Sequence, residues 1–256
     1  RLDRPYVREN GKLRPASWAE ALDVVAAKVK GASADRIGVI AGDLQDAESM
    51  KAAKDLFGSL GVKSLDCRQD GMALGEGARE TWLFNSTIAG IEEADVILFV
   101  GANPRLEAPV LNARFRKRWL NNALRIGVIG EQADLTYKYD YLGAGPESLT
   151  GLSKSRGDFV KALKEAKNPA IIVGAGALAR ADGAAVLAAA AQAAKTFGMS
   201  WNVLHTAASR VAGLDMGFVP TEGGKTAREL VAPGGADLLV LLGADELELT
   251  ASDAFV

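Results

Sequence analysis

Residues 91–120 read IEEADVILFVGANPRLEAPVLNARFRKRWL, and this stretch decides the fold of the chain. Asp95 is followed by an uninterrupted apolar run to Val100, which is typical of a parallel strand buried on both faces. A short polar loop follows. Pro109 stands where a helix would begin. Proline lacks a backbone N–H, but the first residue of a helix has no intrahelical partner for that group. Because loops at the carboxyl ends of strands are the usual ligand sites of open α/β sheets, the loop after Val100 is a candidate binding site.

Six further short apolar runs alternate with helical patterns along the chain. They are residues 36–41, 63–66, 124–129, 170–173, 200–204 and 237–242. Seven strands that alternate with helices favour an α/β fold with doubly wound parallel sheets. Residues 1–15 lack periodicity and are predicted to be extended. A helix after Ser17 is expected to open with a capping box and to carry Trp18, Leu22, Val25 and Val29 on one face.

The composition shifts to glycine, serine, proline and lysine between residues 145 and 157. Such a shift is typical of a boundary between compact units. We therefore predict two Rossmann-like units, 1–150 and 151–256, with the second truncated at its C-terminus. The chain starts at Arg1 without a methionine, and we expect it to be a fragment of a longer protein.

Composition excludes several classes of function. The 256 residues carry a formal net charge of −2, so the charge balance does not indicate a nucleic-acid partner or insertion into a membrane. Cys67 is the single cysteine and His205 the single histidine. These residues therefore cannot form a disulfide, an iron–sulfur cluster site or a two-histidine metal site by themselves.

The segment Gly174–Ala179 follows a predicted strand and matches the dinucleotide fingerprint G-x-G-x-x-A. Nucleotide binding also needs an acidic residue about 20 positions on, at the end of the next strand. That strand ends at Leu204 and His205, and Asp182 comes too early. The pattern favours a tight strand-to-helix turn over a nucleotide site.

Four other features have alternative interpretations. His205 has the pKa range of a general base or metal ligand, but a structural hydrogen bond at a strand end is the simpler role. Arg68 could activate Cys67, although lone cysteines are commonly buried small hydrophobes. The basic run 114–118 could steer an anion or an acidic partner, or form a solvated helix face. Glu92 and Glu93 lack a second carboxylate pair for acid–base catalysis.

Several segments resemble, in order, the large iron–sulfur subunits of respiratory NADH:quinone oxidoreductase (complex I). They are RPYVRENGKLRPASWAEAL from Arg4, NSTIAGIEEADVILFVGANPRLEAPVLNARFRKRWL from Asn85, DLTYKYDYLG from Asp134, KNPAIIVGAGALARADGAAVLAA from Lys167 and ADLLVLLGADE from Ala236. The resemblance runs nearly end to end.

This resemblance implies a molybdopterin oxidoreductase fold like that of formate dehydrogenase or DMSO reductase. It also implies iron–sulfur clusters in an N-terminal region outside these residues, and other subunits of the complex I peripheral arm as partners. The implied location is the cytoplasmic face of the bacterial inner membrane or the mitochondrial matrix side.

The resemblance implies that the loop matching Gly101–Pro109 helps to hold the pterin in catalytic relatives. Gly101, Asn103, Pro104 and Arg105 are therefore vestigial candidates for cofactor binding. Those relatives usually place a histidine before the loop's proline, where this chain has Ala108. Asn103 is expected to cap the turn, with Arg105 and Glu107 forming an internal pair or touching a neighbouring subunit.

The same relatives coordinate molybdenum through a cysteine, selenocysteine or serine in the segment matching Asp66–Gly77. Here Cys67 matches a residue several positions earlier, and the ligand position reads Asp70-Gly71-Met72-Ala73. We therefore expect a non-catalytic scaffold without catalytic residues, metal or cofactor in this fragment. The alternatives are an active molybdopterin-dependent oxidoreductase domain and, on Gly174 and Gly176, an NAD-binding dehydrogenase domain.

Overall fold

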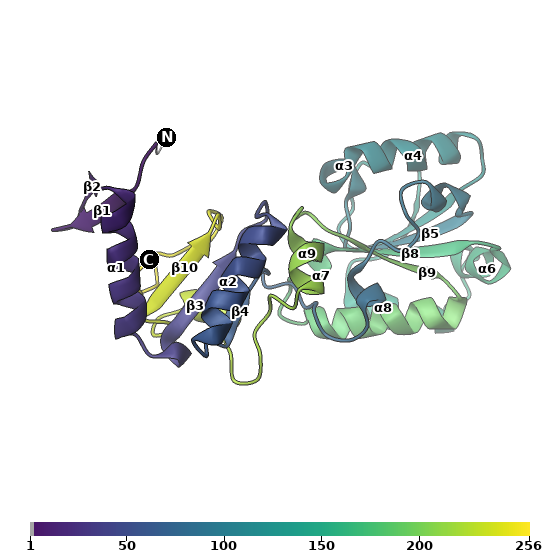
Figure 1. Ribbon diagram of the computed structural model, residues 1–256. Helices are drawn as coiled ribbons and strands as arrows, with labels where there is room; N and C mark the ends of the chain where they lie inside the picture. The colour runs from purple at the N-terminus through teal and green to yellow at the C-terminus, as the bar shows by residue number, and fades with distance from the viewer. Residues whose placement is uncertain (1–2) are drawn as a thin grey trace. The chain divides into compact units, whose positions relative to one another are not determined.

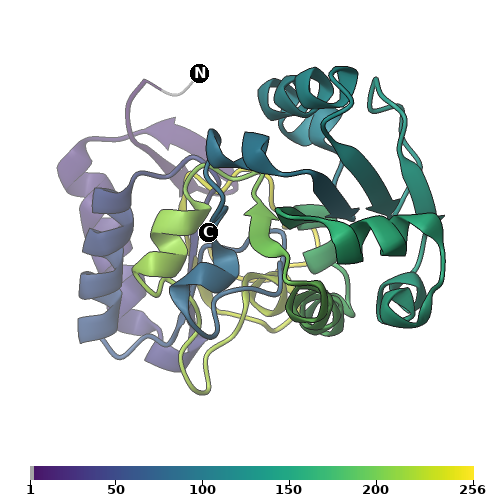
Figure 2. The ribbon, with the colours of Figure 1, turned by 90° about the vertical axis from the view of Figure 1, so that its right-hand side faces the viewer.

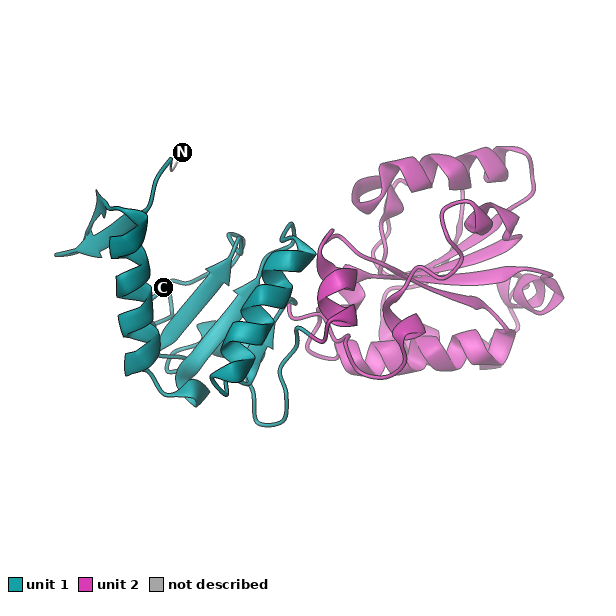
Figure 3. Cartoon of the chain, in the orientation of Figure 1, with its two compact units in different colours: residues 1–69, 218–256 teal, residues 70–217 magenta. Residues whose placement is uncertain are grey.

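The computed structural model describes residues 3–256, and the chain folds into two compact α/β units (Figure 3). Unit 1 comprises residues 1–69 and 218–256, and unit 2 comprises residues 70–217. The predicted division at residue 150 is wrong. Strands β5 (Val96–Val100) and β8 (Pro169–Gly174) lie on either side of that position yet pair in one sheet. The glycine-rich stretch therefore connects parts of a single unit.

Unit 1 is built on a three-stranded parallel sheet of order β10-β3-β4, preceded by a β1-β2 hairpin. Its elements are β1 (Tyr6–Glu9), β2 (Lys12–Pro15), α1 (Trp18–Gly31), η1 (Ala34–Arg36), β3 (Ile37–Ala41), α2 (Ala47–Ser59), β4 (Ser64–Asp66), α10 (Ala227–Val231) and β10 (Leu238–Leu242). The hairpin lies in the opening segment that is predicted to be extended, of which Arg1 and Leu2 fall outside the described residues.

Helix α1 forms where predicted but leaves Trp18, Leu22 and Val25 of its apolar face exposed. The Ser17 hydroxyl accepts a hydrogen bond from the Glu20 N–H, and the Glu20 carboxylate also pairs with Arg14. Trp18 is 70% exposed and Leu22 is 58% exposed. The predicted amphipathic face is therefore a surface of unit 1.

Unit 2 is built on a five-stranded parallel sheet of order β7-β6-β5-β8-β9. Its remaining elements are η2 (Arg79–Trp82), η3 (Gly90–Glu93), α3 (Pro104–Glu107), α4 (Pro109–Leu120), β6 (Arg125–Ile129), β7 (Asp140–Gly143), α5 (Pro146–Thr150), η4 (Leu152–Lys154), α6 (Asp158–Glu165), α7 (Ala175–Leu178), α8 (Gly183–Phe197), β9 (Ser200–Leu204) and α9 (Arg210–Asp215). All seven predicted strands are confirmed.

Helices cover both faces of the unit 2 sheet, with α4 on one side and α8 on the other (Figures 1 and 2). All five residues of β5 are buried at the centre of the sheet. Phe99 of β5 meets Phe115 of α4 edge-on, with ring centroids 5.4 Å apart. The doubly wound prediction is therefore confirmed for this unit.

The strand order reverses between β5 and β8. From β5 the chain builds β6 and β7 on one side, and it then returns to add β8 and β9 on the other. The loops after β5 and β8 consequently leave the same sheet edge in opposite directions. In doubly wound folds this reversal opens a crevice at the carboxyl ends of the strands.

Candidate functional site

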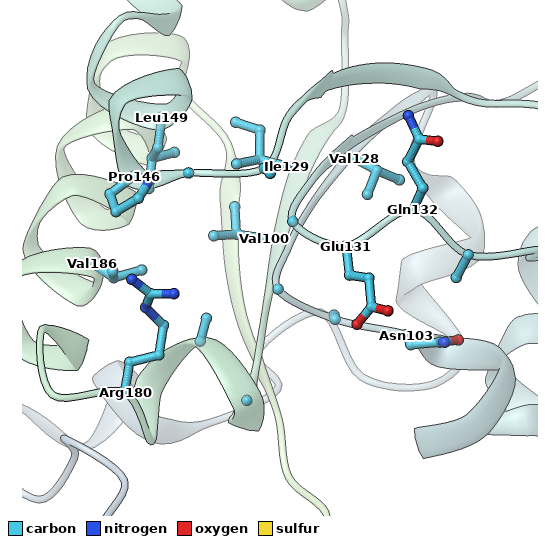
Figure 4. A pocket seen from close by; sticks show the side chains of 18 of the residues that line it. Val100, Asn103, Val128, Ile129, Glu131, Gln132, Pro146, Leu149, Arg180 and Val186 are labelled. Atoms are coloured by element: carbon cyan, nitrogen blue, oxygen red, sulfur yellow. The ribbon is translucent and has the colours of Figure 1, made fainter.

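A cavity of about 510 Å³ lies at the carboxyl ends of β5, β6 and β8 in unit 2. Asn103 and Glu131 lie on one side of it, and Pro146, Arg180 and Val186 on the other (Figure 4). Ligand pockets in proteins commonly measure about 300–1,000 Å³, so this crevice is large enough for a small molecule. The cavity lies where the loop after Val100 is predicted to bind a ligand.

The loop after β5 is held tightly against the turn after β8. Gly101 adopts the left-handed region with φ 56°, which glycine enters without a steric penalty. A Cβ atom on Gly174 would lie 2.2 Å from the Gly101 carbonyl oxygen. Gly174, the first glycine of the fingerprint, therefore lets the backbone of the turn after β8 approach the backbone of the loop after β5. The tight-turn interpretation requires this close approach. Further along, Arg180 pairs with Asp182 on the surface.

The three other predicted loop residues are held by contacts within unit 2. Pro104 is the buried first residue of α3, and Asn103 occupies the predicted N-cap position, although its side chain makes no cap hydrogen bond. The first alternative, an internal Arg105–Glu107 pair, is wrong, because Arg105 bonds the Asp134 carboxylate at 2.5 Å and the Asp134 carbonyl at 2.8 Å. The other alternative, contact with a neighbouring subunit, stays a prediction. Arg105 thereby ties the loop after β5 to the segment after β6.

Glu107 closes the turn that Asn103 is predicted to cap. Its carboxylate accepts a hydrogen bond from the Asn103 backbone N–H at 3.0 Å. Its second oxygen and the Asn103 side-chain oxygen are both buried without a hydrogen-bond partner. Burial raises the pKa of the Glu107 carboxyl above its ordinary value of 4.5, against the opposing effect of the Asn103 N–H. The spacing of four residues is the only sequence signal for this contact.

The raised pKa of Glu107 predicts a pH-dependent effect of Glu107→Gln. A carboxyl whose pKa is higher in the folded state loses stabilising free energy as pH rises through that pKa. Glutamine resembles the protonated form, so the variant should gain stability relative to the wild type at pH 8 and match it near pH 4. Urea unfolding at both pH values measures the difference. Glu107→Ala, which loses the bond to Asn103, should be destabilised at both.

Cys67 does not have the surroundings of a reactive thiol. Its side chain is fully buried, and its backbone N–H donates to the Phe218 carbonyl at 3.0 Å, all within unit 1. The neighbouring Arg68 forms an ion pair with Asp66 at 2.8 Å. The interpretation of Cys67 as a buried small hydrophobe is confirmed.

The segment that matches the metal-ligand position is occupied by an ion pair. Asp70 accepts a hydrogen bond from the Met72 N–H at 3.1 Å, and its carboxylate lies 3.1 Å from the Arg210 guanidinium. The Arg210 side chain is fully buried and lies 3.6 Å from the Met72 sulfur. With no thiolate or hydroxyl in the segment and a cation against it, these residues do not fit a molybdenum ion.

His205 has the predicted structural hydrogen bond at the end of β9. Its Nε2 lies 2.6 Å from the Trp82 carbonyl oxygen, so Nε2 carries the proton, and the buried Nδ1 has no partner. Burial lowers the pKa of the His205 imidazole, which favours the neutral ring. Among residues 3–256, the structure brings together no group of three or more histidine, cysteine or acidic side chains that could hold a metal.

The basic run on α4 is largely paired inside unit 2. Arg114 and Lys117 bond the two oxygens of Glu92, at 2.5 and 2.8 Å. Arg118 donates to the carbonyl groups of Ala94 and Ala123. These charges hold α4 to η3 and its neighbouring loops.

The chain matches known proteins along its whole length. A family model described as molybdopterin oxidoreductase matches residues 1–256. The G-type subunit of the NADH-quinone oxidoreductase of Rickettsia conorii is 43% identical over 224 residues, which cover 85% of this chain and 33% of that protein. The mitochondrial NADH dehydrogenase (ubiquinone) iron-sulfur protein 1 of Solanum tuberosum is 38% identical over 265 residues, covering 100% of this chain and 35% of that protein. The chain spans about a third of the length of these curated relatives.

Proposed function

We propose, from the premise that this chain belongs to the molybdopterin oxidoreductase family, that it serves as a non-catalytic scaffold in the large iron–sulfur subunit of NADH:quinone oxidoreductase. In this proposal the parallel sheets of the family persist while the molybdenum chemistry is lost. A fold can persist after the site that once used it has changed.

The observation that carries the proposal is the Asp70–Arg210 ion pair at the metal-ligand segment. The resemblance implies that a cysteine, selenocysteine or serine coordinates molybdenum there in the catalytic relatives. Asp70, Gly71, Met72 and Ala73 offer no thiolate, selenolate or hydroxyl, and the one carboxylate among them is paired with a guanidinium. The described residues that line the crevice include no serine, threonine, cysteine, lysine or histidine that could act as a nucleophile.

Electron transfer from NADH to quinone is assigned, in this proposal, to the remaining part of the subunit. A single cysteine cannot hold an iron–sulfur cluster, which typically takes four thiolates. The clusters are therefore proposed to lie in the cysteine-rich N-terminal region that the resemblance implies. The residues of this chain would contribute the folded body against which neighbouring parts assemble.

Uncovered apolar surface supports an assembly role. Leu13, Trp18, Leu22 and Val25 on and beside α1 are all about half exposed or more. Large exposed apolar patches commonly mark sites of protein association. The proposed partners are other subunits of the complex I peripheral arm, on the cytoplasmic face of the bacterial membrane or the matrix side. No described helix is both long enough and apolar enough to cross a membrane.

Elemental and pterin analysis tests the scaffold assignment. The full-length subunit, purified under conditions that preserve its iron–sulfur clusters, should contain molybdenum and tungsten far below one atom per chain and release no pterin on oxidation. A catalytically active relative from the same family, purified in parallel, provides the positive control. Stoichiometric metal or pterin would contradict the proposal.

The crevice itself favours a second candidate, an active molybdopterin-dependent domain with a non-standard ligand. Its 510 Å³ volume and the close approach of Gly101 and Gly174 are compatible with a bound cofactor. In that case Asp70→Asn or Cys67→Ala should lower the metal content. Unchanged metal content in both variants would remove this candidate.

An NAD-binding role predicts a higher melting temperature at millimolar NADH, and Gly174→Ala should abolish the increase.

A further inference from the structure

The outer surface of α3 and α4 combines exposed apolar side chains with an excess of positive charge. The two helices lie end to end along one face of the unit 2 sheet (Figure 1), and only Ala108 separates them in the chain. Leu106 is 78% exposed and Val110 is 76% exposed, which makes them the most exposed large apolar side chains in the described part of unit 2. Neither side chain contributes much to the core of the unit.

The outward face of α4 continues this surface. Side chains three and four residues apart lie on the same side of a helix. Val110, Ala113 and Lys117 follow this spacing and are exposed, as is Leu120 one turn further on. The opposite face of α4, around Phe115, is the face that packs on the sheet. The outward face is therefore partly apolar although the sheet does not cover it.

The two helices also concentrate positive charge. They contain five arginine and lysine side chains and one glutamate, whereas the whole chain has a formal net charge of −2. Arg114 and Lys117 share the single carboxylate of Glu92. Arg116 and Arg118 donate to backbone carbonyl groups, which carry no formal charge. Positive charge is therefore only partly balanced by these contacts.

This combination fits a protein partner better than a nucleic acid or a membrane. Protein interfaces have an apolar centre and a polar rim, and the helical spacing places Arg114 and Arg116 on either side of the apolar stripe. A phosphate backbone is bound mainly by cations and offers nothing to exposed aliphatic side chains. An amphipathic helix enters a membrane with its apolar face, but that face of α4 lies on the sheet.

We propose that the α3–α4 surface docks an acidic segment of another polypeptide, which carries apolar side chains between its carboxylates. This surface comprises Leu106, Val110, Ala113, Arg116, Lys117 and Leu120. Burial of the apolar side chains would supply most of the affinity. The carboxylates of the segment would meet the cations and set its orientation.

This inference deepens the proposed assembly role in complex I and rests on it, yet the two can fail separately. Stoichiometric molybdenum in the subunit would contradict the non-catalytic scaffold and leave docking at this surface untouched. A metal-free subunit whose assembly does not depend on the α3–α4 surface would end only this inference.

A charge placed in the centre of the surface tests the docking. In cells whose only large subunit carries Val110→Asp, the amount of assembled complex should fall about tenfold or more, because the new carboxylate would face an acidic segment. The melting temperature of the isolated full-length subunit should change by less than about 2 °C, since Val110 is 76% exposed and lies in the first turn of α4, where a negative charge is favourable.

Ile88→Asp is the matched control, because Ile88 is a 61% exposed aliphatic residue of unit 2 outside the α3–α4 surface. It should assemble like the wild type. Native gel electrophoresis measures assembly for all three proteins. Wild-type assembly of Val110→Asp, or an equal loss in both variants, would overturn the inference.

Arg116 tests the charge separately from the apolar contact. Arg116→Glu should lower assembly about tenfold, whereas Arg116→Lys keeps the cation and should assemble nearly as well as the wild type. The only hydrogen bond recorded for the Arg116 side chain goes to the Thr136 carbonyl. Equal loss in both variants would assign the effect to that bond and contradict the charge complementarity.

A photoreactive side chain at Leu106 identifies the occupant in the purified complex. The cross-linked peptide should come from another subunit and contain more acidic than basic residues. Cross-linking to the same subunit, to a second copy of it, to lipid or to a basic segment would overturn the proposal.

Discussion

Phe99→Ala is expected to lower the free energy of unfolding of unit 2 by about 4 kcal/mol. Phe99 is the fourth residue of the central strand β5 and is fully buried. Its ring packs edge-on against Phe115 of α4. Truncation removes this contact and leaves a cavity that a sheet paired on both sides of β5 cannot easily close. Urea unfolding followed by circular dichroism measures the loss.

Leu106→Ala provides the control for this substitution. Leu106 lies on α3, close in sequence to Phe99, but is 78% exposed. Its truncation should change the free energy of unfolding by less than about 0.5 kcal/mol. If the two substitutions cost the same, β5 would not be the centre of the unit 2 core.

Gly174→Ala is expected to cost about 3 kcal/mol through overpacking. The new Cβ atom would meet backbone, lying 2.2 Å from the Gly101 oxygen and 2.7 Å from the Ala102 Cα. Backbone atoms cannot rotate away as a side chain can, so the loops after β5 and β8 must separate. Thermal unfolding reports the loss of stability, and amide exchange in residues 101–107 reports the opening of the crevice.

Gly176→Ala separates this steric effect from the general loss of a glycine. The nearest atom to a Cβ atom at Gly176 is the Gly101 oxygen at 3.9 Å, an ordinary contact distance. Alanine should therefore be tolerated there, with a small change of either sign. Equal destabilisation by both substitutions would contradict the steric account of the turn.

The strands were predictable because each is a local run of apolar residues. The strand predicted at residues 95–100 forms at Val96–Val100, and the run predicted at 237–242 forms at Leu238–Leu242. Residues that are buried on both faces of a parallel sheet must be apolar at successive positions. The sequence pattern consequently placed these strands to within about one residue.

The division into units could not be predicted in the same way. Strand β10 pairs with β3 across about two hundred residues of chain, and β8 pairs with β5 across the glycine-rich stretch near residue 150. Composition reports local flexibility, whereas a unit boundary depends on which strands share a sheet. The same limit applied to α1, because its pattern did not show that Trp18 and Leu22 of the predicted apolar face would be exposed.

The candidate site was predicted in position but not in its contacts. Gly101 and Gly174 meet at the crevice as the strand-end rule indicates. Glu107 was expected only as a partner of Arg105 or of a neighbouring subunit, and Arg210 was not identified, although each carries a buried charge or polar group in unit 2. Arg210 did leave a signal, since it is a lone charge among small and apolar residues between Ala207 and Leu214.

The sequence by itself determined the seven strands, the family resemblance and the missing thiolate at the ligand position, because these depend on residue identity and local periodicity. The tertiary structure alone decided which strands share a sheet, that Arg105 pairs with Asp134, and that a buried Arg210 faces Asp70. Each of these joins residues far apart in the chain. Such partners are selected by packing and charge compensation in the folded state, which no local pattern contains.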